Sequence, residues 1–180
     1  MATGATLYNF DIDLADADRS VYETLALRLA RHPSESEEYL VTRVLAYALE
    51  HAEGIAFSTG GLSDPDEPAL TVRDRTGALR VWIEVGSPDA ARLHKASKAS
   101  PRVVVYTHKD AERLASRLSG ERIHRADALE LYAIDPAFIG ALASRLDRRM
   151  AFALSISDHE LFVSIGADTL TGQVVRRALA

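Results

Sequence analysis

Three acidic residues and two lysines have the side-chain types that metal-dependent phosphodiester hydrolysis requires. The acids are Asp66, Glu67 and Glu84, and the lysines are Lys95 and Lys98. Mg²⁺ takes hard oxygen ligands in near-octahedral geometry, so two or more carboxylates must meet at one point. A lysine beside them can orient the attacking water or stabilise developing negative charge. We therefore predict Mg²⁺ as a candidate cofactor, with Asp66 and Glu84 as ligands and Lys95 near the scissile phosphate.

A hairpin is the element that could bring the two acidic segments together. Residues 69–74 and 79–86 are predicted strands around a turn at 75–77. Asp66 and Glu84 flank that turn almost symmetrically, so antiparallel pairing would place them side by side. Because side chains alternate along a strand, Glu84 should share a face with Trp82 and point away from Ile83.

Each candidate also has a purely structural interpretation. A carboxylate at position 84 can form an ion pair with an arginine at a sheet edge, which the pattern favours as strongly as a metal role. Asp66 and Glu67 stand in a Pro-rich segment, where turn formation is the simpler explanation. Lys95 and Lys98 continue a stripe at helical spacing that starts at Arg92, and such a stripe is typical of a solvated helix face.

Periodicity predicts an α/β fold with a mixed β-sheet flanked by helices. A continuous run of valines near 103–105 indicates a strand covered on both faces. With the strand at 79–86 and a helix opened by Ser87, that run forms a βαβ unit. Ser34 and Glu37 match a capping box for a helix over 35–52. The remaining strands are expected at 5–13, 21–30, 128–134, 150–157, 160–165 and 169–176, and further helices at about 109–118 and after Asp135-Pro136.

Composition narrows the class of protein. The chain of 180 residues suits a single domain over 1–180, and its lack of cysteine excludes a disulfide scaffold, a Cys-ligated zinc site and a thiol nucleophile. No apolar run approaches 18 residues and no leader segment is recognisable, so we expect a cytoplasmic protein without a membrane partner. The sequence does not indicate an oligomeric state.

Charge is unevenly distributed in this acidic chain. The net formal charge is −5, but residues 87–110 hold five Lys/Arg against two Asp/Glu, whereas residues 11–67 hold thirteen Asp/Glu against four Lys/Arg. An acidic half beside a basic segment is compatible with metal and phosphate meeting at their border. Nucleic acid is therefore a possible partner.

Several segments together resemble the YaeQ family of bacterial proteins. They are Ala30-Arg31-His32-Pro33-Ser34-Glu35, Gly61-Leu62 with Asp66-Glu67-Pro68, Trp82-Ile83-Glu84-Val85-Gly86 with Pro88-Asp89, Lys95-Ala96, and Val104-Val105-Tyr106-Thr107. The resemblance covers essentially the whole chain. It implies a fold resembling the PD-(D/E)XK restriction-endonuclease-like superfamily.

The resemblance also implies roles for individual positions. Asp66, in a literal Pro-Asp pair, resembles the first acid of the superfamily, with Glu67 as the competing candidate, and Glu84 resembles the second acid. The superfamily's lysine position is occupied by Gly86, so Lys95, and after it Lys98, would be the substitutes. Glu38 matches the position of an auxiliary acid in many such nucleases.

Two functions from different classes follow. The first is a Mg²⁺-dependent nuclease-like enzyme. The second is a non-catalytic cytoplasmic protein that uses the same fold to bind nucleic acid or a protein partner. The retained acids favour the first function and Gly86 favours the second.

Overall fold

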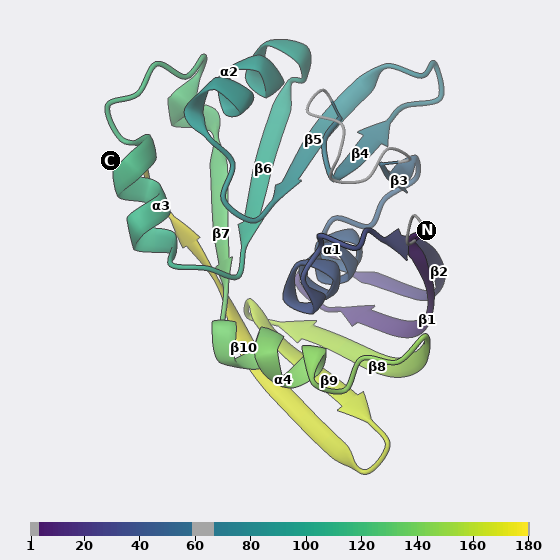
Figure 1. Cartoon of the computed structure of the whole chain (residues 1–180). Helices are drawn as coiled ribbons and strands as arrows, with labels where there is room; N and C mark the ends of the chain where they lie inside the picture. The colour runs from purple at the N-terminus through teal and green to yellow at the C-terminus, as the bar shows by residue number, and fades with distance from the viewer. Residues whose placement is uncertain (1–3, 59–66, 180) are drawn as a thin grey trace. The chain divides into compact units, whose positions relative to one another are not determined.

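The chain folds into two compact units, and the computed structural model describes residues 4–58 and 67–179 (Figure 1). Among these residues, the first unit holds 4–41 and 134–174, and the second holds 42–133 and 175–179. Asp66 lies outside the described residues.

The first unit is built on a long N-terminal hairpin, as predicted. β1 (Thr6–Asp16) pairs antiparallel with β2 (Val21–Arg31) in a continuous register that sets Phe10 opposite Leu27. The strict alternation of buried and exposed residues explains why both segments form strands, since one face of each is packed and the other is solvated. Leu25, Leu27 and Leu29 supply the buried face of β2.

Three C-terminal strands complete the order β2-β1-β8-β9-β10. β8 (Arg149–Ser157) lies parallel to β1, and β9 (Glu160–Ile165) pairs antiparallel with both β8 and β10 (Asp168–Arg177). Before them, α4 (Pro136–Ala143) begins as predicted, with the Asp135 carboxylate accepting from the Ala137 N–H. Gly172 lets α4 approach β10, because a Cβ there would lie 2.5 Å from Phe138 Cβ.

The first helix starts later than the capping box predicts. α1 spans Glu37–Leu49, and the hydroxyl of Ser36 accepts the Tyr39 N–H at 3.1 Å. The predicted cap, Ser34, is instead engaged by His32, whose Nδ1 lies 2.7 Å from the Ser34 hydroxyl. The prediction of Ser34 as the cap was therefore wrong, because a local turn contact competes for its side chain.

The second unit contains strands in the order β3-β4-β5-β6-β7. The hairpin predicted around residues 75–77 is confirmed as β4 (Leu70–Arg73) and β5 (Leu79–Val85), and a short strand that the pattern missed, β3 (Ile55–Phe57), pairs with β4. β5, β6 (Arg102–Thr107) and β7 (Glu130–Ile134) are mutually parallel, so the predicted βαβ unit is confirmed.

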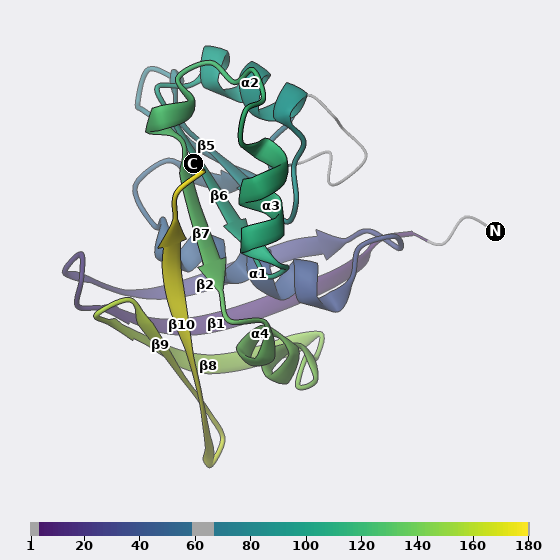
Figure 2. The same cartoon turned by 90° about the vertical axis from the view of Figure 1, so that its left-hand side faces the viewer.

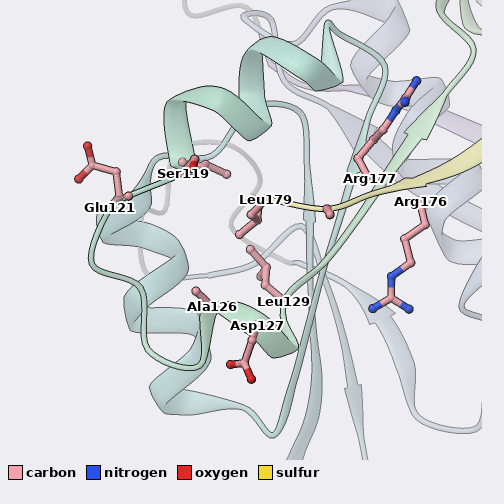
Figure 3. A pocket seen from close by; sticks show the side chains of 11 residues that line it. Ser119, Glu121, Ala126, Asp127, Leu129, Arg176, Arg177 and Leu179 are labelled. Atoms are coloured by element: carbon pink, nitrogen blue, oxygen red, sulfur yellow. The ribbon is translucent and has the colours of Figure 1, made fainter.

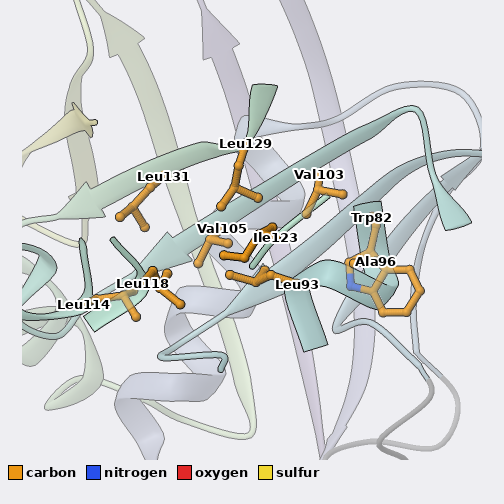
Figure 4. Close-up of a cluster of buried hydrophobic side chains, with 10 residues drawn as sticks. All are labelled: Trp82, Leu93, Ala96, Val103, Val105, Leu114, Leu118, Ile123, Leu129 and Leu131. Atoms are coloured by element: carbon orange, nitrogen blue, oxygen red, sulfur yellow. The ribbon is translucent and has the colours of Figure 1, made fainter. Parts of the chain in front are cut away.

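Two helices cover one face of these parallel strands (Figure 2). α2 (Ala90–Ala99) begins at Asp89, whose carboxylate accepts the Arg92 N–H at 2.8 Å, so the expected cap at Ser87 was wrong. α3 (Ala111–Leu118) follows β6, and a short 3₁₀ turn occupies Ala126–Ala128. Figure 4 shows the resulting core, formed by Trp82, Leu93, Ala96, Val103, Val105, Leu114, Leu118, Ile123, Leu129 and Leu131.

The described residues thus form an α/β protein with ten strands in mixed pairing and four α-helices. This confirms the predicted fold class at that level. None of the helices in the described ranges is both long enough and apolar enough to cross a membrane.

Candidate functional site

Glu84 lies on the face of β5 that the alternation predicts. It shares that face with Trp82, whose indole ring belongs to the core beneath α2. The carboxylate is almost fully buried, with 5% of the side chain exposed. Its Oε1 accepts two hydrogen bonds, from the indole Nε1–H of Trp82 at 2.6 Å and from the Nε–H of Arg92 at 2.7 Å.

Burial dominates the electrostatics of this carboxylate. Loss of water raises the pKa of Glu84 above its ordinary value, although the Trp82 hydrogen bond and the charge of Arg92 both act to lower it. The nearby Asp89 raises the pKa further. An ionised carboxylate is costly in such a place unless it is paired, and Arg92 supplies the pairing charge.

Arg92 also links Glu84 to the second acidic segment. While its Nε binds Glu84, its Nη2 donates to the backbone carbonyl of Glu67. The Glu67 carboxylate in turn accepts a hydrogen bond from the Ser58 hydroxyl at 2.5 Å. The main chain of Glu67 and the side chain of Glu84 therefore lie against the same guanidinium. The predicted proximity of Asp66 to Glu84 stays a prediction, because Asp66 lies outside the described residues.

The basic stripe on α2 reaches Glu84 through its first member. Arg92 makes the contact, whereas Lys95 and Lys98, one and two turns later, are exposed. No cation other than Arg92 is among the groups that shift the pKa of Glu84. Glu38 is exposed in the first turn of α1.

Gly86, where the resemblance implied a lysine in the superfamily, has a backbone conformation that favours glycine. Gly86 has a φ of 95°, which side-chain-bearing residues rarely adopt, and its N–H donates to the Tyr106 carbonyl at 2.9 Å. This conformation turns the chain out of β5 toward Asp89 and α2. A lysine at 86 would strain that turn.

The described residues do not by themselves provide a Mg²⁺ site. Within the ranges 4–58 and 67–179, no three His, Asp or Glu side chains are grouped so that they could hold a metal ion. Glu84 presents one carboxylate, and the guanidinium bound to it repels a second cation. Asp66, the other expected ligand, lies outside these ranges, so the metal site stays a prediction.

A group of basic side chains gathers at the other end of α2. His94 Nδ1 accepts the backbone N–H of His124 at 3.0 Å, and the two rings lie edge to face. Partial burial lowers the pKa of His94, and the positive charges of Lys98, Arg122 and His124 lower it further. Arg125 joins them, because its Nη2 donates to the carbonyls of Ser97 and Ser100 at the end of α2. We call His94, Lys98, Arg122, His124 and Arg125 the cationic surface.

The opposite face of the same strands carries an ionic network that the sequence did not reveal. Arg102 at the start of β6 donates to Glu50 at 2.7 and 3.1 Å and to Glu130 at 2.6 and 3.1 Å. The hydroxyls of Tyr106 and Tyr132 also donate to Glu50 and Glu130, at 2.6 and 3.0 Å, and their rings stack. Hydrogen-bonded partners in the network are up to 56 positions apart in the sequence, so no local motif could have indicated it.

The pKa values of Glu130 and Tyr106, two members of this network, shift in opposite directions. Burial acts to raise the pKa of Glu130, but the hydrogen bonds and charge of Arg102 outweigh it and hold the value below the ordinary one. Burial raises the pKa of Tyr106, and the charge of Glu50 raises it further. The network therefore keeps the Glu130 carboxylate ionised and the Tyr106 phenol neutral, which is the pattern of a structural ion pair.

The second unit also contains an open pocket of about 630 Å³ (Figure 3). The apolar side chains of Leu129 and Leu179 lie at its centre, Asp127 and Arg176 lie at its edge, and Leu118 also lines it. The mixture of both charge signs around an apolar centre does not select one class of ligand.

Comparison with known proteins places the whole chain in one family. The model of the "YaeQ protein" family matches residues 1–174. A relative from Salmonella typhi is 31% identical over 175 residues, covering 97% of this chain and 96% of its own length. One from Escherichia coli K12 is 30% identical over 165 residues, or 91% of each chain. Both have the description "Uncharacterized protein YaeQ".

Solved structures agree with this placement. The crystal structure of the YaeQ protein from Xanthomonas axonopodis pv. citri matches with a TM-score of 0.85 at 32% identity, covering 97% of this chain and 98% of the other. The YaeQ protein from Pseudomonas syringae gives a TM-score of 0.86 at 32% identity, covering 97% of each chain. Sequence and structure thus support the same conclusion, and the chain belongs to the YaeQ family.

Proposed function

We propose that the protein is a non-catalytic nucleic-acid-binding protein whose fold resembles that of PD-(D/E)XK nucleases. The observation that carries the proposal is the convergence of Lys98, Arg122 and His124 on His94, together with Arg125 beside the end of α2. Closely spaced cations on one surface repel one another, so such a surface is stabilised by an anionic ligand. A sugar–phosphate backbone presents anions at regular spacing and suits it.

The wider charge distribution supports the same ligand. Between Arg92 and Arg125 the chain has nine Lys/Arg against three Asp/Glu, in a protein whose net formal charge is −5. Arg92 and Arg102 form ion pairs with Glu84, Glu50 and Glu130, which leaves seven of the nine outside these pairs. These residues include α2 and α3, which cover the same face of the sheet. A basic region on one layer of an otherwise acidic protein is the electrostatic footprint of a nucleic-acid site.

The state of Glu84 favours binding over hydrolysis. Its carboxylate is buried and paired with Arg92, and the backbone at Gly86 does not suit the lysine of the superfamily pattern. Glu84 and Glu67 therefore have structural partners in the described part of the chain, namely Arg92 and Ser58. We place the activity in the cytoplasm, within a single YaeQ-like domain over residues 1–180.

Fluorescence anisotropy with labelled single-stranded DNA, duplex DNA and RNA, titrated at 50 and 200 mM salt, tests the proposal. We expect affinity to fall steeply with salt, because phosphate contacts release counterions. A Lys98→Ala/Arg122→Ala variant should bind more weakly, and its log–log salt slope should be smaller in magnitude by roughly 1.5.

Arg75→Ala is the matched control, because Arg75 is also exposed but pairs with Glu53, which is not part of the cationic surface. It should leave both the affinity and the salt slope unchanged. Failure of all three nucleic acids to bind at 50 mM salt would overturn the proposal. So would equal losses in the double variant and the control.

The second candidate is Mg²⁺-dependent phosphodiester hydrolysis, with Asp66 and Glu84 as ligands and Lys95 or Lys98 near the phosphate. It is favoured by one observation, namely that Arg92 binds both the Glu84 carboxylate and the main chain of Glu67, next to Asp66. Calorimetric titration with Mg²⁺ and Mn²⁺ discriminates between the candidates. Binding that Glu84→Gln abolishes would support hydrolysis, and no heat from either metal would exclude this site.

A further inference from the structure

The segment that follows α3 is held on α2 by side-chain and backbone contacts within the second unit. The side chain of Ile123 belongs to the core cluster beneath α2 (Figure 4). The backbone N–H of His124 donates to His94 Nδ1 at 3.0 Å. Arg125 then donates from Nη2 to two carbonyls at the end of α2, at 2.8 and 3.2 Å. The fold of one unit therefore sets the positions of Arg122 and His124 beside α2.

Positive charges from two elements meet at His94. Lys98 lies one helical turn after His94 on the same face of α2, and Arg122 and His124 approach from the segment after α3. Partial burial lowers the pKa of His94, and the charges of these three residues act in the same direction. Among the described residues, no carboxylate contributes to this shift. The positive charge is therefore concentrated around one side chain.

His94 carries its ring proton on a defined nitrogen. A backbone N–H only donates, so Nδ1 must be the unprotonated acceptor of the His124 N–H. The proton of the neutral ring is then on Nε2, the nitrogen farther from the main chain. His94 therefore offers a neutral hydrogen-bond donor beside the cations that surround it.

We propose that the cationic surface binds the terminal phosphate of a nucleic-acid strand, which is a phosphomonoester. This inference rests on the proposed function, because it names the part of the nucleic acid that the surface recognises. A phosphomonoester carries a charge of about −1.5 to −2 at pH 7, whereas each phosphodiester of the backbone carries a single charge. Concentrated charge on the ligand matches cations that converge on one residue, and the Nε2–H of His94 adds a donor for a phosphate oxygen.

The approach of the donors from two elements also favours a strand end over an internal phosphate. His94 and Lys98 belong to α2, whereas Arg122 and His124 belong to the segment after α3. A terminal phosphate has only one esterified oxygen, so donors on different sides can each bind a free oxygen. An internal phosphodiester has two esterified oxygens and leaves fewer for such donors.

Fluorescence anisotropy with one internally labelled oligonucleotide in three forms tests the inference. The forms carry a 5′-phosphate, a 3′-phosphate, or hydroxyl groups at both ends. We expect one of the phosphorylated forms to bind at least about tenfold more tightly than the hydroxyl form, because charge-assisted hydrogen bonds to the terminal phosphate are added. A mononucleotide with the same terminal phosphate should compete only weakly, because it lacks the rest of the strand.

His94→Asn is the most informative variant. The Asn Oδ1 is as many bonds from the main chain as Nδ1, so it can accept the His124 N–H while the Nε2–H is removed. The preference for the phosphorylated end should fall below about threefold. The Lys98→Ala/Arg122→Ala variant should lose the same preference, so the test does not depend on one substitution.

His159→Asn is the matched control. His159 is exposed in the first unit beside Asp18, and its φ of 61° is one that Asn tolerates. This variant should keep the full preference for the phosphorylated end. Thermal melts show that each variant is folded.

The outcomes separate this inference from the function on which it rests. Equal affinity for the three forms would overturn the inference and leave nucleic-acid binding standing, whereas no binding of any form would overturn both. A preference that His94→Asn and the double variant leave unchanged would also overturn the inference. So would a mononucleotide that binds as tightly as the phosphorylated strand, because the ligand would then be a free phosphomonoester.

Discussion

The Nε of Arg92 lies 2.7 Å from the Oε1 of Glu84, across the connection from β5 to α2. The pair is unequal in burial, since 25% of the arginine side chain is exposed against 5% of the glutamate side chain. Arg92 can therefore keep part of its hydration while Glu84 depends on its partners. Because of this difference in burial, replacing Glu84 is the more informative test of whether the ion pair stabilises the fold.

Glu84→Gln should lower the free energy of unfolding by about 1–3 kcal/mol, because an amide oxygen accepts the Trp82 and Arg92 hydrogen bonds less strongly than a carboxylate does. The loss should be smallest at high pH, where burial opposes the charge of the parent carboxylate. Urea melts of the two proteins without added metal measure the difference. An Arg92→Gln/Glu84→Gln double variant should lose less than the sum of the single losses, since the pair is then removed together. An unfolding midpoint that is unchanged or higher in Glu84→Gln would instead favour the metal-ligand role.

The pH dependence of stability should differ in sign between Glu84 and Glu130. The pKa of Glu84 is raised in the fold, so its contribution is fully present below the ordinary value of 4.5 and is lost as pH rises through the folded value. The pKa of Glu130 is lowered, so its contribution is present above 4.5 and is lost as pH falls through the folded value. Urea melts of Glu84→Gln and Glu130→Gln from pH 3 to 8, subtracted from the parent protein, isolate each contribution. If both differences in unfolding free energy changed with pH in the same direction, the opposite pKa shifts of Glu84 and Glu130 would be contradicted.

Arg102→Met should destabilise the protein by roughly 2–3 kcal/mol, because it leaves Glu50 and Glu130 as neighbouring carboxylates. This loss is smaller than the roughly 3–5 kcal/mol typical of a fully buried pair, because 37% of the Arg102 side chain is exposed to solvent. Arg75→Met removes an arginine whose pair with Glu53 is fully accessible, so its effect should stay below about 0.5 kcal/mol. Similar losses from the two variants would show that the Arg102 network has no special role.

Gly86→Ala should cost about 1–2 kcal/mol, because it places a Cβ on a residue with a φ of 95°. Gly86→Lys should cost at least as much, and we expect no nuclease activity from it, although it places a lysine where the proposed superfamily resemblance would have one. Thermal melts and a gel assay with plasmid DNA and Mg²⁺ measure the two outcomes. A stable, active Gly86→Lys variant would show that the glycine alone had removed catalysis.

Local chemistry made much of the fold predictable. The alternation in residues 5–13 and 21–30 corresponds to β1 and β2, and Asp135 caps α4 through a contact two residues away. These features depend on residues close to one another in the sequence, so a short segment of the sequence is enough to predict them. The face on which Glu84 lies was predictable for the same reason, since a strand has a period of two.

Competition between equally local contacts limited the prediction of helix starts. Ser34 and Ser36 are both suitable caps, and the contact of His32 with Ser34 decides between them. Asp89 similarly caps α2 in place of Ser87. The sequence correctly indicated that a short polar side chain caps each helix. Which of the neighbouring polar residues does so depends on the path of the backbone.

The partners of the charged residues were decided by tertiary structure alone. Whether Glu84 meets Arg92 or Lys95 depends on the turn at Gly86, which sets the rotation of α2 over the sheet. Glu50 and Arg102 are 52 residues apart and meet only because α1 ends beside the start of β6. An ion pair needs a distance of about 3 Å between particular atoms. The sequence states which charges exist, but only the packing of helices on strands determines which of them come that close.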